Sequence, residues 1–306
     1  MNEIKVFGHQ SPDTDATCSA IVWTWFISTQ RNKPATAYVL GTPNTEAQFV
    51  LNHWGVATPK LLKSVSEDDV VSIVDTNNVD ELFPNINDCE ILSIIDHHKL
   101  TGGLKTSTPL EVIIQPYASS MTVMFNVMNI EPADFPREIA GLMLSGILSD
   151  TLEFRSPTLT DTDRELAAKL ASALNIDMTE YANEMFAAKS DISHFSDAEL
   201  LRLDSKIYDI QGKQIRIAVL ETTDPRVALD RKDSLVAAMD IVCAEDNVEH
   251  ILLFVIDILK EEATVVIQNE VVRGMIDKGF DITTTRDTHV LPGVVSRKKQ
   301  IVPALS

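Results

Sequence analysis

ILSIIDHH, residues 91–98, is an apolar run that ends at one carboxylate and two imidazoles, and it decides the fold. A short run of apolar and β-branched residues predicts a buried β-strand. In open α/β sheets, ligands bind at the carboxyl ends of the strands. The stretch therefore predicts a functional site at Asp96, His97 and His98.

Two other stretches have the same form. Residues 4–7 (IKVF) run into GHQSPDTD at residues 8–15, and residues 70–74 (VVSIV) run into DTNN at residues 75–78. Because the carboxyl ends of parallel strands lie side by side, polar residues that are distant in sequence can converge there. The residues that we expect to converge are His9, Asp13, Asp15, Asp75 and His97.

The chain has the pattern of two domains. Residues 1–188 alternate strand-like and helix-like segments, which predicts a parallel sheet covered by helices. The polar residues 189–195 interrupt this pattern and predict a linker. Residues 196–306 predict a smaller domain of mixed α/β structure. The fold class is therefore α/β.

The spacing of apolar residues locates the individual elements. The predicted strands are residues 4–7, 35–40, 70–74, 91–95, 111–114, 206–210, 214–219, 250–256 and 263–268. The predicted helices are residues 16–29, a segment capped by Asn44 or Thr45, and residues 119–128, 137–148, 160–173, 178–188 and 234–244.

The composition is that of a globular protein, with 44% hydrophobic and 23% charged residues. No apolar run approaches the roughly 18–20 residues of a membrane span, and no secretion signal begins the chain, so we expect a cytoplasmic protein without a membrane partner. A net charge of −19 repels polyanions, so we expect no nucleic-acid partner. The three cysteines are widely spaced, which predicts reduced, structural thiols.

Asp150 lies just beyond the helix predicted at residues 137–148. A carboxylate at a helix C-terminus is electrostatically unfavourable unless a cation lies near it. Asp150 is therefore either a further metal ligand or a solvated loop residue, and the local sequence leaves both open.

The converging residues and Asp150 supply carboxylates and imidazoles but no thiolate. This ligand set suits Mn²⁺ or Co²⁺ and tolerates Mg²⁺. Carboxylates held this close repel one another unless cations neutralise them, and two ions that share a bridging carboxylate meet that requirement. Two ions about 3.5–4 Å apart can bind one water, lower its pKa and direct the bridging hydroxide at phosphorus. The predicted chemistry is hydrolysis of a phosphoester or phosphoanhydride.

Further cations are needed to hold such a substrate. Arg297, Lys298 and Lys299 form a basic cluster that either binds phosphate or neutralises an acidic surface. His98 is expected to point away from His97 if the backbone stays extended, and so to face the substrate as a proton or hydrogen-bond donor.

Together, these motifs resemble the family II inorganic pyrophosphatases, which are manganese- or cobalt-dependent members of the DHH phosphoesterase superfamily. The motifs are GHQSPDTD (8–15), DHH (96–98), SD (149–150) with FRSPT (154–158), and SRKKQ (296–300). The DHH triplet alone would indicate only the superfamily. The resemblance implies hydrolysis of pyrophosphate to two orthophosphates with two or more Mn²⁺ ions per subunit, for which Co²⁺ or Mg²⁺ can substitute. It also implies a homodimer formed through the N-terminal domain, and an active site in the cleft between the domains.

The resemblance further implies a role for each matching residue. The ligands implied for one ion are His9 and Asp13, those for the other are Asp15, His97 and Asp150, and Asp75 would bridge them. The implied catalytic residues are Asp15, Asp75 and His98. His98 would contact the substrate and assist the leaving group. Lys206, Arg297 and Lys298 would bind the phosphate groups from the C-terminal domain.

One position departs from the family pattern. The bridging aspartate is usually followed by His-Asn-Glu, whereas Asp75 is followed by Thr76, Asn77 and Asn78. Neighbours of a ligand set its orientation and basicity, so this departure predicts an altered metal preference or affinity.

Other functions remain open from the sequence. A phosphodiesterase that cleaves short oligonucleotides or an exopolyphosphatase would share the DHH triplet, although the former carries a glycine-rich stretch with a histidine where this chain has SRKKQ. A non-catalytic metal or phosphate sensor would require a broken site, whereas every expected ligand and cation is present.

Overall fold

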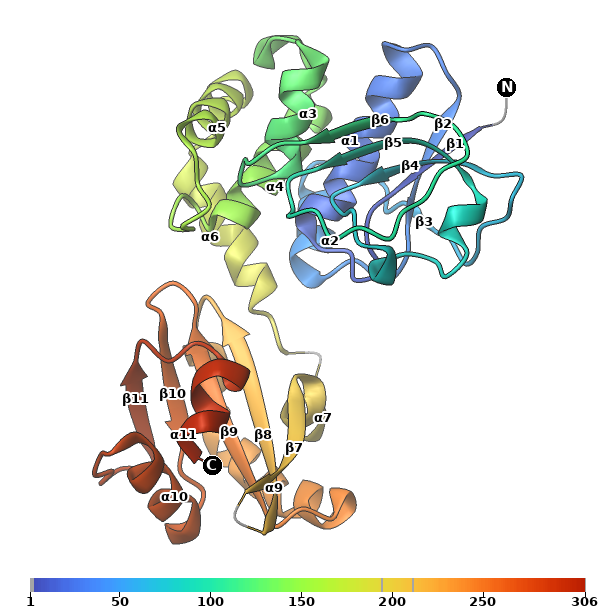
Figure 1. Ribbon diagram of the computed structural model, residues 1–306. Helices are drawn as coiled ribbons and strands as arrows, with labels where there is room; N and C mark the ends of the chain where they lie inside the picture. Colours follow the sequence, from blue (N-terminus) through green and yellow to red (C-terminus); the bar gives the residue numbers. More distant parts are fainter. Residues whose placement is uncertain (1–2, 194, 211, 306) are drawn as a thin grey trace. The chain divides into compact units, whose positions relative to one another are not determined.

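The chain divides into two compact units, Met1–Ala188 and Lys189–Ser306 (Figure 1). The computed structural model describes residues 3–193, 195–210 and 212–305. We call the two parts the N-terminal unit and the C-terminal unit.

The N-terminal unit is built on a sheet whose described strands follow the order β3-β2-β1-β4-β5-β6. These strands are β1 (Ile4–Phe7), β2 (Ala35–Val39), β3 (Lys60–Leu61), β4 (Val70–Val74), β5 (Glu90–Asp96) and β6 (Glu111–Ile114). Every neighbouring pair is parallel, which confirms the predicted sheet. The strand order reverses between β1 and β4, and such a switch point is where open α/β sheets bind ligands.

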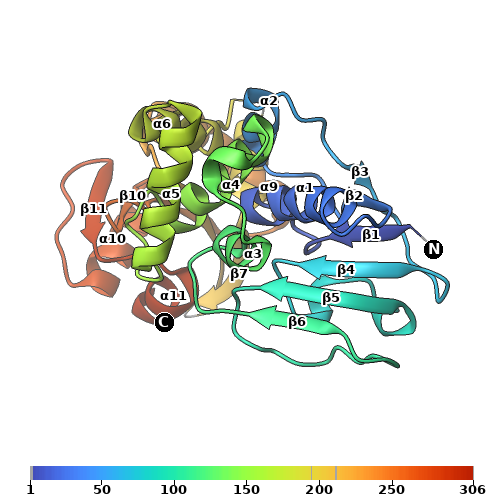
Figure 2. The ribbon, with the colours of Figure 1, turned by 90° about the horizontal axis from the view of Figure 1, so that it is seen from above.

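Helices cover one face of this sheet. They are α1 (Thr14–Thr29), α2 (Thr45–His53), α3 (Ser120–Met128), α4 (Arg137–Thr151), α5 (Asp161–Leu174) and α6 (Met178–Lys189). Figure 2 shows α1, α3 and α4 on the same side of β4, β5 and β6. Their apolar side chains form one core with Val6 and Val74. The next residue in β1 and the preceding one in β4, Phe7 and Ile73, belong to a second core on the opposite face, as the alternation of side chains along a strand requires.

The C-terminal unit has a mixed sheet in the order β11-β10-β9-β8-β7. Its strands are β7 (Ser205–Ile210), β8 (Lys213–Thr222), β9 (His250–Asp257), β10 (Glu262–Val266) and β11 (Thr288–Pro292), and its helices are α7 (Asp197–Leu203), α8 (Arg226–Leu229), α9 (Lys232–Asp246), α10 (Glu270–Phe280) and α11 (Val302–Leu305). β8 and β9 are parallel, and the other pairs are antiparallel. Separate apolar cores lie on its two faces, so each unit buries its own core.

The predicted elements are present, with ends shifted by a few residues, whereas β3, α7, α8, α10, β11 and α11 were not predicted. A signal for α10 existed, because Asn269 caps the helix and Val272 and Ile276 form its buried stripe. The segment predicted as a linker, residues 189–195, falls within the C-terminal unit, where Arg231 Nη1 donates to the Ile192 carbonyl at 3.0 Å. Residue 194 of that segment, and residue 211 between the paired strands β7 and β8, lie outside the described residues.

None of the helices in the described part of the chain combines the length and apolarity that crossing a membrane requires.

Candidate metal centre

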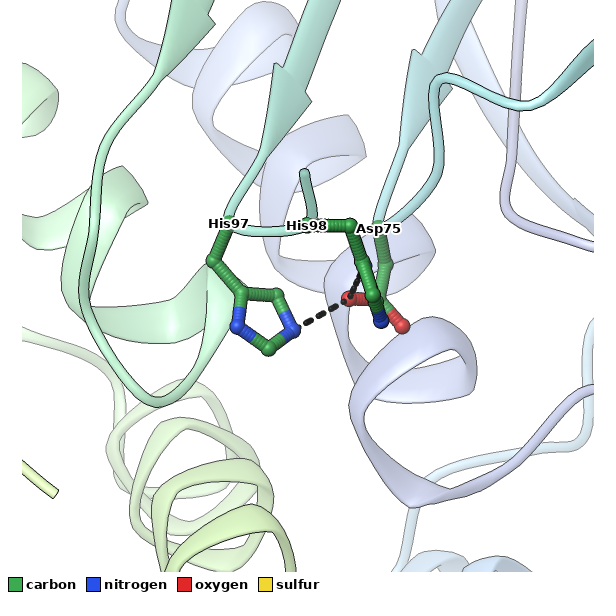
Figure 3. A group of neighbouring side chains, drawn as sticks. All are labelled: Asp75, His97 and His98. Atoms are coloured by element: carbon green, nitrogen blue, oxygen red, sulfur yellow. Dashed lines mark ion pairs between the residues drawn. The ribbon is translucent and has the colours of Figure 1, made fainter. Parts of the chain in front are cut away.

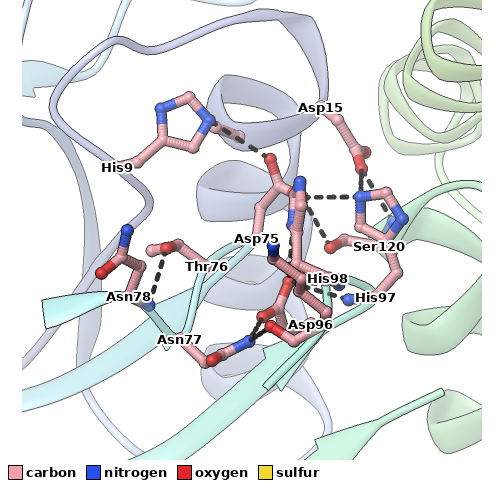
Figure 4. A network of polar contacts seen from close by, with 12 residues as sticks. His9, Asp15, Asp75, Thr76, Asn77, Asn78, Asp96, His97, His98 and Ser120 are labelled. Carbon is pink, nitrogen blue, oxygen red and sulfur yellow. Dashed lines mark hydrogen bonds and ion pairs between the residues drawn. The ribbon is translucent and has the colours of Figure 1, made fainter. Parts of the chain in front are cut away.

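The polar residues that follow β1, β4 and β5 gather at the switch point of the sheet (Figure 4). His9 comes two residues after the end of β1, Asp75 follows β4, and His97 follows β5. Asp15 lies in the first turn of α1, and Asp150 lies in the last turn of α4. The parallel topology therefore brings together side chains from residue 9 to residue 150.

His9, Asp13 and Asp75 form the first of the groups whose ligand atoms all lie within 4.8 Å of one another. His9 Nε2 lies 3.7 Å from Asp13 Oδ2 and 3.6 Å from Asp75 Oδ2. Asp13 is also the N-cap of α1, since its Oδ1 accepts from the Ala16 backbone N–H at 2.9 Å. Capping fixes this carboxylate at the start of the helix and leaves its other oxygen to face His9.

Asp15, His97 and Asp150 form a second such group. His97 Nε2 lies 3.8 Å from Asp15 Oδ2, 3.4 Å from Asp150 Oδ2 and 3.3 Å from Asp75 Oδ1. The two oxygens of Asp75 thus face different groups, with Oδ2 toward His9 and Oδ1 toward His97. All the sequence-predicted ligands are brought together in these two groups, including Asp150.

His98 lies on the same side as His97 and Asp75, as Figure 3 shows. The two imidazole centroids are 4.2 Å apart, and His98 Nδ1 lies 3.9 Å from Asp75 Oδ1. The expectation that His98 points away from His97 is therefore wrong. It assumed an extended backbone, but Asp96 Oδ1 accepts from the backbone N–H groups of both His97 and His98, which turns the chain at the strand end.

The pKa values of the buried carboxylates show where negative charge is unfavourable in the absence of a cation. Burial, and then the charge of Asp75, raise the pKa of Asp15 to about 7. Burial and the charge of Asp15 raise the pKa of Asp150 well above its usual range. Burial alone would also raise the pKa of Asp75, but the nearby imidazoles of His9 and His97 outweigh burial and lower it. Without a cation, the charges of these carboxylates oppose one another.

The imidazoles respond in the opposite direction. Burial alone would lower the pKa of His9, but the nearby carboxylates of Asp13 and Asp75 outweigh it and raise the pKa to about 10. Burial would also lower the pKa of His97, but the nearby carboxylates of Asp75 and Asp15 outweigh it and raise the pKa to about 9. Protons therefore supply positive charge where the ligand set would place a metal ion.

The backbone is strained beside two of these residues. Asp75 has a φ of 56°, in the left-handed region that few residues other than glycine adopt. Leu152, Glu153 and Phe154, directly after α4, have φ values of 48°, 50° and 69°. Such strain is found at functional sites, where the surrounding structure holds it in place.

Sequence reasoning missed the residues that hold the ligands. Ser119 Oγ donates to Asp15 Oδ1 at 3.0 Å, the Ser120 backbone N–H donates to Asp15 Oδ2 at 2.7 Å, and Ser120 Oγ donates to Asp75 Oδ1 at 2.8 Å. The Tyr117 carbonyl lies 3.1 Å from His97 Nδ1, which directs Nε2 of that ring toward the carboxylates. A serine pair at a helix start signals an N-cap, and nothing in its local sequence signals these contacts.

The residues that depart from the family pattern have partners of their own. Thr76 is buried, and its hydroxyl donates to Glu81 Oε2 at 2.7 Å and accepts from the Asn78 backbone N–H at 3.1 Å. Asn77 Nδ2 donates to Asp96 Oδ2 at 2.5 Å. The Asn77 side chain therefore supports Asp96, whose carboxylate accepts from the backbone N–H groups of His97 and His98. The Thr76 hydroxyl points toward Glu81.

The three predicted substrate-binding cations belong to the C-terminal unit. Lys206 is an exposed residue of β7, and Lys298 is exposed within the π-helical turn Arg297–Ile301. Arg297 Nη1 donates to the Asp204 carbonyl at 2.8 Å, and Nη2 lies 2.7 Å from Asp204 Oδ1. Arg297 is thereby tied to the segment that begins β7 and contains Lys206. π-Helical turns occur frequently at functional sites.

A buried nitrogen without a partner tests whether a metal ion fits the cluster. Within the described part of the chain, the buried His97 Nε2 makes no hydrogen bond, although three carboxylate oxygens lie within 3.8 Å of it. Ligand atoms around an octahedral ion bound at about 2.1 Å lie about 3 Å from one another, so these distances suit a shared cation. An imidazole nitrogen among carboxylate oxygens is a donor set suited to Mn²⁺.

Family models match both parts of the chain. Residues 3–147 match the DHH family N-terminal domain, and residues 183–306 match the DHHA2 domain. The fold and the site therefore define a two-domain protein of the DHH phosphoesterase class.

Individual relatives narrow the class. The manganese-dependent inorganic pyrophosphatase of Bacillus subtilis is 35% identical and covers 100% of this chain and 98% of its own length. A Deinococcus radiodurans protein named as a probable manganese-dependent inorganic pyrophosphatase is 38% identical, over 99% of this chain and 97% of its own length. A solved structure from Methanococcus jannaschii, assigned to family II inorganic pyrophosphatases, is 31% identical with a TM-score of 0.64 and covers 99% and 98%. The chain belongs to the family II, manganese-dependent inorganic pyrophosphatases, as the sequence motifs indicated.

Proposed function

We propose that this protein hydrolyses inorganic pyrophosphate to two orthophosphates with Mn²⁺ as its cofactor. The observation that carries the proposal is the position of Asp75 at the switch point of the sheet: it belongs to the group with His9 and Asp13, and its Oδ1 lies 3.3 Å from His97 of the second group. The similarity to manganese-dependent pyrophosphatases over nearly the full length of the chain supports the same reaction.

We assign the metal ligands from the two groups. His9 and Asp13 would hold one ion, Asp15, His97 and Asp150 would hold the other, and the two oxygens of Asp75 would each face one ion. When bound, the divalent cations neutralise the carboxylates and lower the pKa of coordinated water.

His98 would serve the leaving group. Its side chain is 53% exposed, so a substrate can reach it. A hydrogen bond with Asp96 outweighs burial and raises the pKa of His98, which favours the protonated ring. His98 Nδ1 lies 2.9 Å from Asp96 Oδ1, which leaves Nε2–H to donate to a phosphoryl oxygen.

We propose that residues 196–306, the part of the C-terminal unit after the predicted linker 189–195, bind the substrate. Arg297 can hold two phosphate oxygens at once, and Lys206 and Lys298 supply compact charges. Their cationic character in a chain of net charge −19 supports this assignment. The N-terminal unit, residues 1–188, would then be the metal-binding catalytic domain.

The first experiment measures orthophosphate release from pyrophosphate by metal-stripped protein that is given Mn²⁺, Co²⁺, Mg²⁺ or Zn²⁺. We expect strong release with Mn²⁺ or Co²⁺ and weaker release with Mg²⁺. Asp75→Ala should lose at least about 1,000-fold in kcat, because both groups lose a ligand. Asp80→Ala, which removes an exposed carboxylate nearby, is the matched control and should retain full activity.

Polyphosphate and a dinucleotide should be poor substrates under the same conditions. Faster phosphate release from polyphosphate would instead identify an exopolyphosphatase, and cleavage of the dinucleotide a phosphodiesterase. Pyrophosphate binding without turnover would identify a sensor.

Family membership supports three finer assignments. We propose that the protein is a homodimer formed through its N-terminal unit, that it is cytoplasmic, and that it binds neither nucleic acid nor membranes. Sedimentation of the metal-loaded protein tests the dimer, and a net charge of −19 argues against binding to polyanions.

A further inference from the structure

Glu46 is a buried carboxylate outside the set of ligands. It lies in the first turn of α2, and its side chain is completely buried. Burying a carboxylate costs free energy unless hydrogen bonds compensate for the lost solvation. The contacts of Glu46 should therefore show what holds its charge inside the protein. The N-terminal end of α2 provides part of the compensation, because the helix dipole favours negative charge there.

Two hydroxyl groups from different helices donate to the same oxygen of Glu46. Thr14 Oγ1 donates to Glu46 Oε1 at 2.7 Å, and Ser149 Oγ donates to it as well. Thr14 is the residue between Asp13 and Asp15. Ser149 is the residue before Asp150.

One carboxylate oxygen therefore joins the start of α1 to the end of α4. These two helix ends carry ligand residues from both metal groups, Asp13 in one and Asp15 and Asp150 in the other. The start of α2 also holds the loop that leads into α1, because the Asn44 backbone N–H donates to the Pro12 carbonyl at 3.1 Å.

We propose that Glu46 is a positioning residue of the metal centre: by accepting the hydroxyls of Thr14 and Ser149, it sets the separation of Asp15 and Asp150. This inference rests on the proposed metal-dependent function and adds a residue that touches neither metal nor substrate. Partners that orient metal ligands typically contribute about 10–100-fold to metal affinity.

The proposal attributes the effect to an accepting oxygen and not to charge alone. Gln offers a carbonyl oxygen of the same reach, so it can accept both hydroxyls, whereas Ala can accept neither. Glu46→Gln should therefore retain most of the Mn²⁺ affinity, and Glu46→Ala should lose it.

The test is Mn²⁺ binding to the metal-stripped full-length protein, measured by titration calorimetry, with kcat measured alongside. We expect Glu46→Ala, Thr14→Val and Ser149→Ala each to weaken Mn²⁺ binding by about 10–100-fold. Because both hydroxyls act through Glu46, adding Ser149→Ala to Glu46→Ala should weaken binding no further.

Ser145→Ala is the matched control for Ser149→Ala. Ser145 lies one turn earlier on α4 and is buried, and its hydroxyl lies 2.6 Å from the Tyr181 hydroxyl and 3.1 Å from Trp54 Nε1. It links α4 to α6 and to Trp54, the residue after α2, and its hydroxyl bonds to no proposed ligand. Ser145→Ala should therefore lower thermal stability and leave Mn²⁺ affinity unchanged.

Three outcomes would overturn the proposal: wild-type Mn²⁺ affinity in Ser149→Ala, equal losses in Ser145→Ala and Ser149→Ala, or a loss in Glu46→Gln as large as that in Glu46→Ala. Thr14→Val and Ser149→Ala carry the test if Glu46→Ala fails to fold. Failure of the wild-type protein to bind Mn²⁺ would instead reject the metal centre itself, so the two failures are distinguishable.

Discussion

Gly146 shows how a single residue makes room for the metal centre. It lies inside α4, and a Cβ at this position would approach Asp15 Oδ1 and Met121 Cγ, each to 2.7 Å. Glycine inside a helix normally costs about 1 kcal/mol relative to alanine, so its presence here reflects the lack of space beside Asp15.

We predict that Gly146→Ala destabilises the protein by about 1–3 kcal/mol, because the new methyl group displaces buried neighbours. Mn²⁺ affinity should fall in the same variant, since Asp15 must move. Gly274→Ala, inside α10 with open space around the position, is the control and should raise stability by up to about 1 kcal/mol. Thermal unfolding with and without Mn²⁺ measures both effects, and a more stable Gly146→Ala would contradict the prediction.

The histidine ligands couple metal binding to pH. His9 and His97 have pKa values raised to about 10 and about 9, so both rings are protonated near pH 7 in the absence of metal. A histidine must be neutral to bind a metal ion. Mn²⁺ must therefore displace these protons.

We predict that Mn²⁺ binding at pH 7 releases at least two protons, because the pKa values of the ligands Asp15 and Asp150 are raised as well, and that affinity rises by about 100-fold or more per pH unit between pH 6 and 8. The sign follows from mass action, because lower pH favours the protonated, metal-free form. Calorimetry in buffers with different ionisation enthalpies measures the proton count. Binding heats that do not depend on the buffer would show that the rings are already neutral.

At the scale of elements, the segment from Tyr117 to Thr122 is the support of the site. It contacts His97, Asp15 and Asp75, and it is held in turn by the buried Asp163 at the start of α5. Asp163 accepts from the Ala118 backbone N–H at 3.1 Å, from Thr122 Oγ1 at 2.6 Å and from the Thr160 backbone N–H at 2.9 Å. One carboxylate thus joins the capping box of α5 to the start of α3.

We predict that Asp163→Ala lowers stability by about 2–4 kcal/mol, because it leaves buried backbone donors without acceptors. It should also weaken Mn²⁺ binding, since the segment loses its anchor. Thr160→Ala removes the N-cap of α5 and leaves the bonds from Ala118 and Thr122 intact, so it should cost about 1 kcal/mol and spare Mn²⁺ affinity. Denaturant unfolding measures the stability of the two variants, and calorimetry measures their Mn²⁺ affinity. Equal Mn²⁺ affinity in both variants would refute a supporting role for Asp163.

At the scale of the whole molecule, the proposed ligands and the proposed substrate cations belong to different units. Each unit has its own apolar core, and the six proposed ligands all lie in residues 1–188. Lys206, Arg297 and Lys298 all lie beyond residue 188. Metal binding and turnover should therefore be separable.

We predict that a fragment of residues 1–188 folds and binds Mn²⁺ with an affinity close to that of the full chain, but does not hydrolyse pyrophosphate. The full-length Arg297→Ala variant should also bind Mn²⁺ normally. Its kcat/KM for pyrophosphate should fall, chiefly through a raised KM. Turnover by the isolated fragment would show that the C-terminal cations are not needed.

Much of the N-terminal fold could be predicted because its elements have strong local signals. Buried strands such as residues 91–95 are apolar runs, and the N-cap of α2 is Asn44, a residue type that favours this position. In the C-terminal unit, α7 and α10 were missed although Ser196 and Asn269 cap them, because a short helix with a narrow apolar stripe resembles a polar loop.

The sequence by itself determined the family, the parallel sheet and the residues proposed as ligands, because each depends on motifs or on apolar spacing along a few consecutive residues. Only the tertiary structure decided that His98 lies beside His97, that Gly146 adjoins Asp15, and that Glu46 and Asp163 support the site. Apart from the adjacent histidines, these contacts join segments that are far apart in the chain. A buried hydrogen bond depends on which elements pack together, and local sequence does not record that choice.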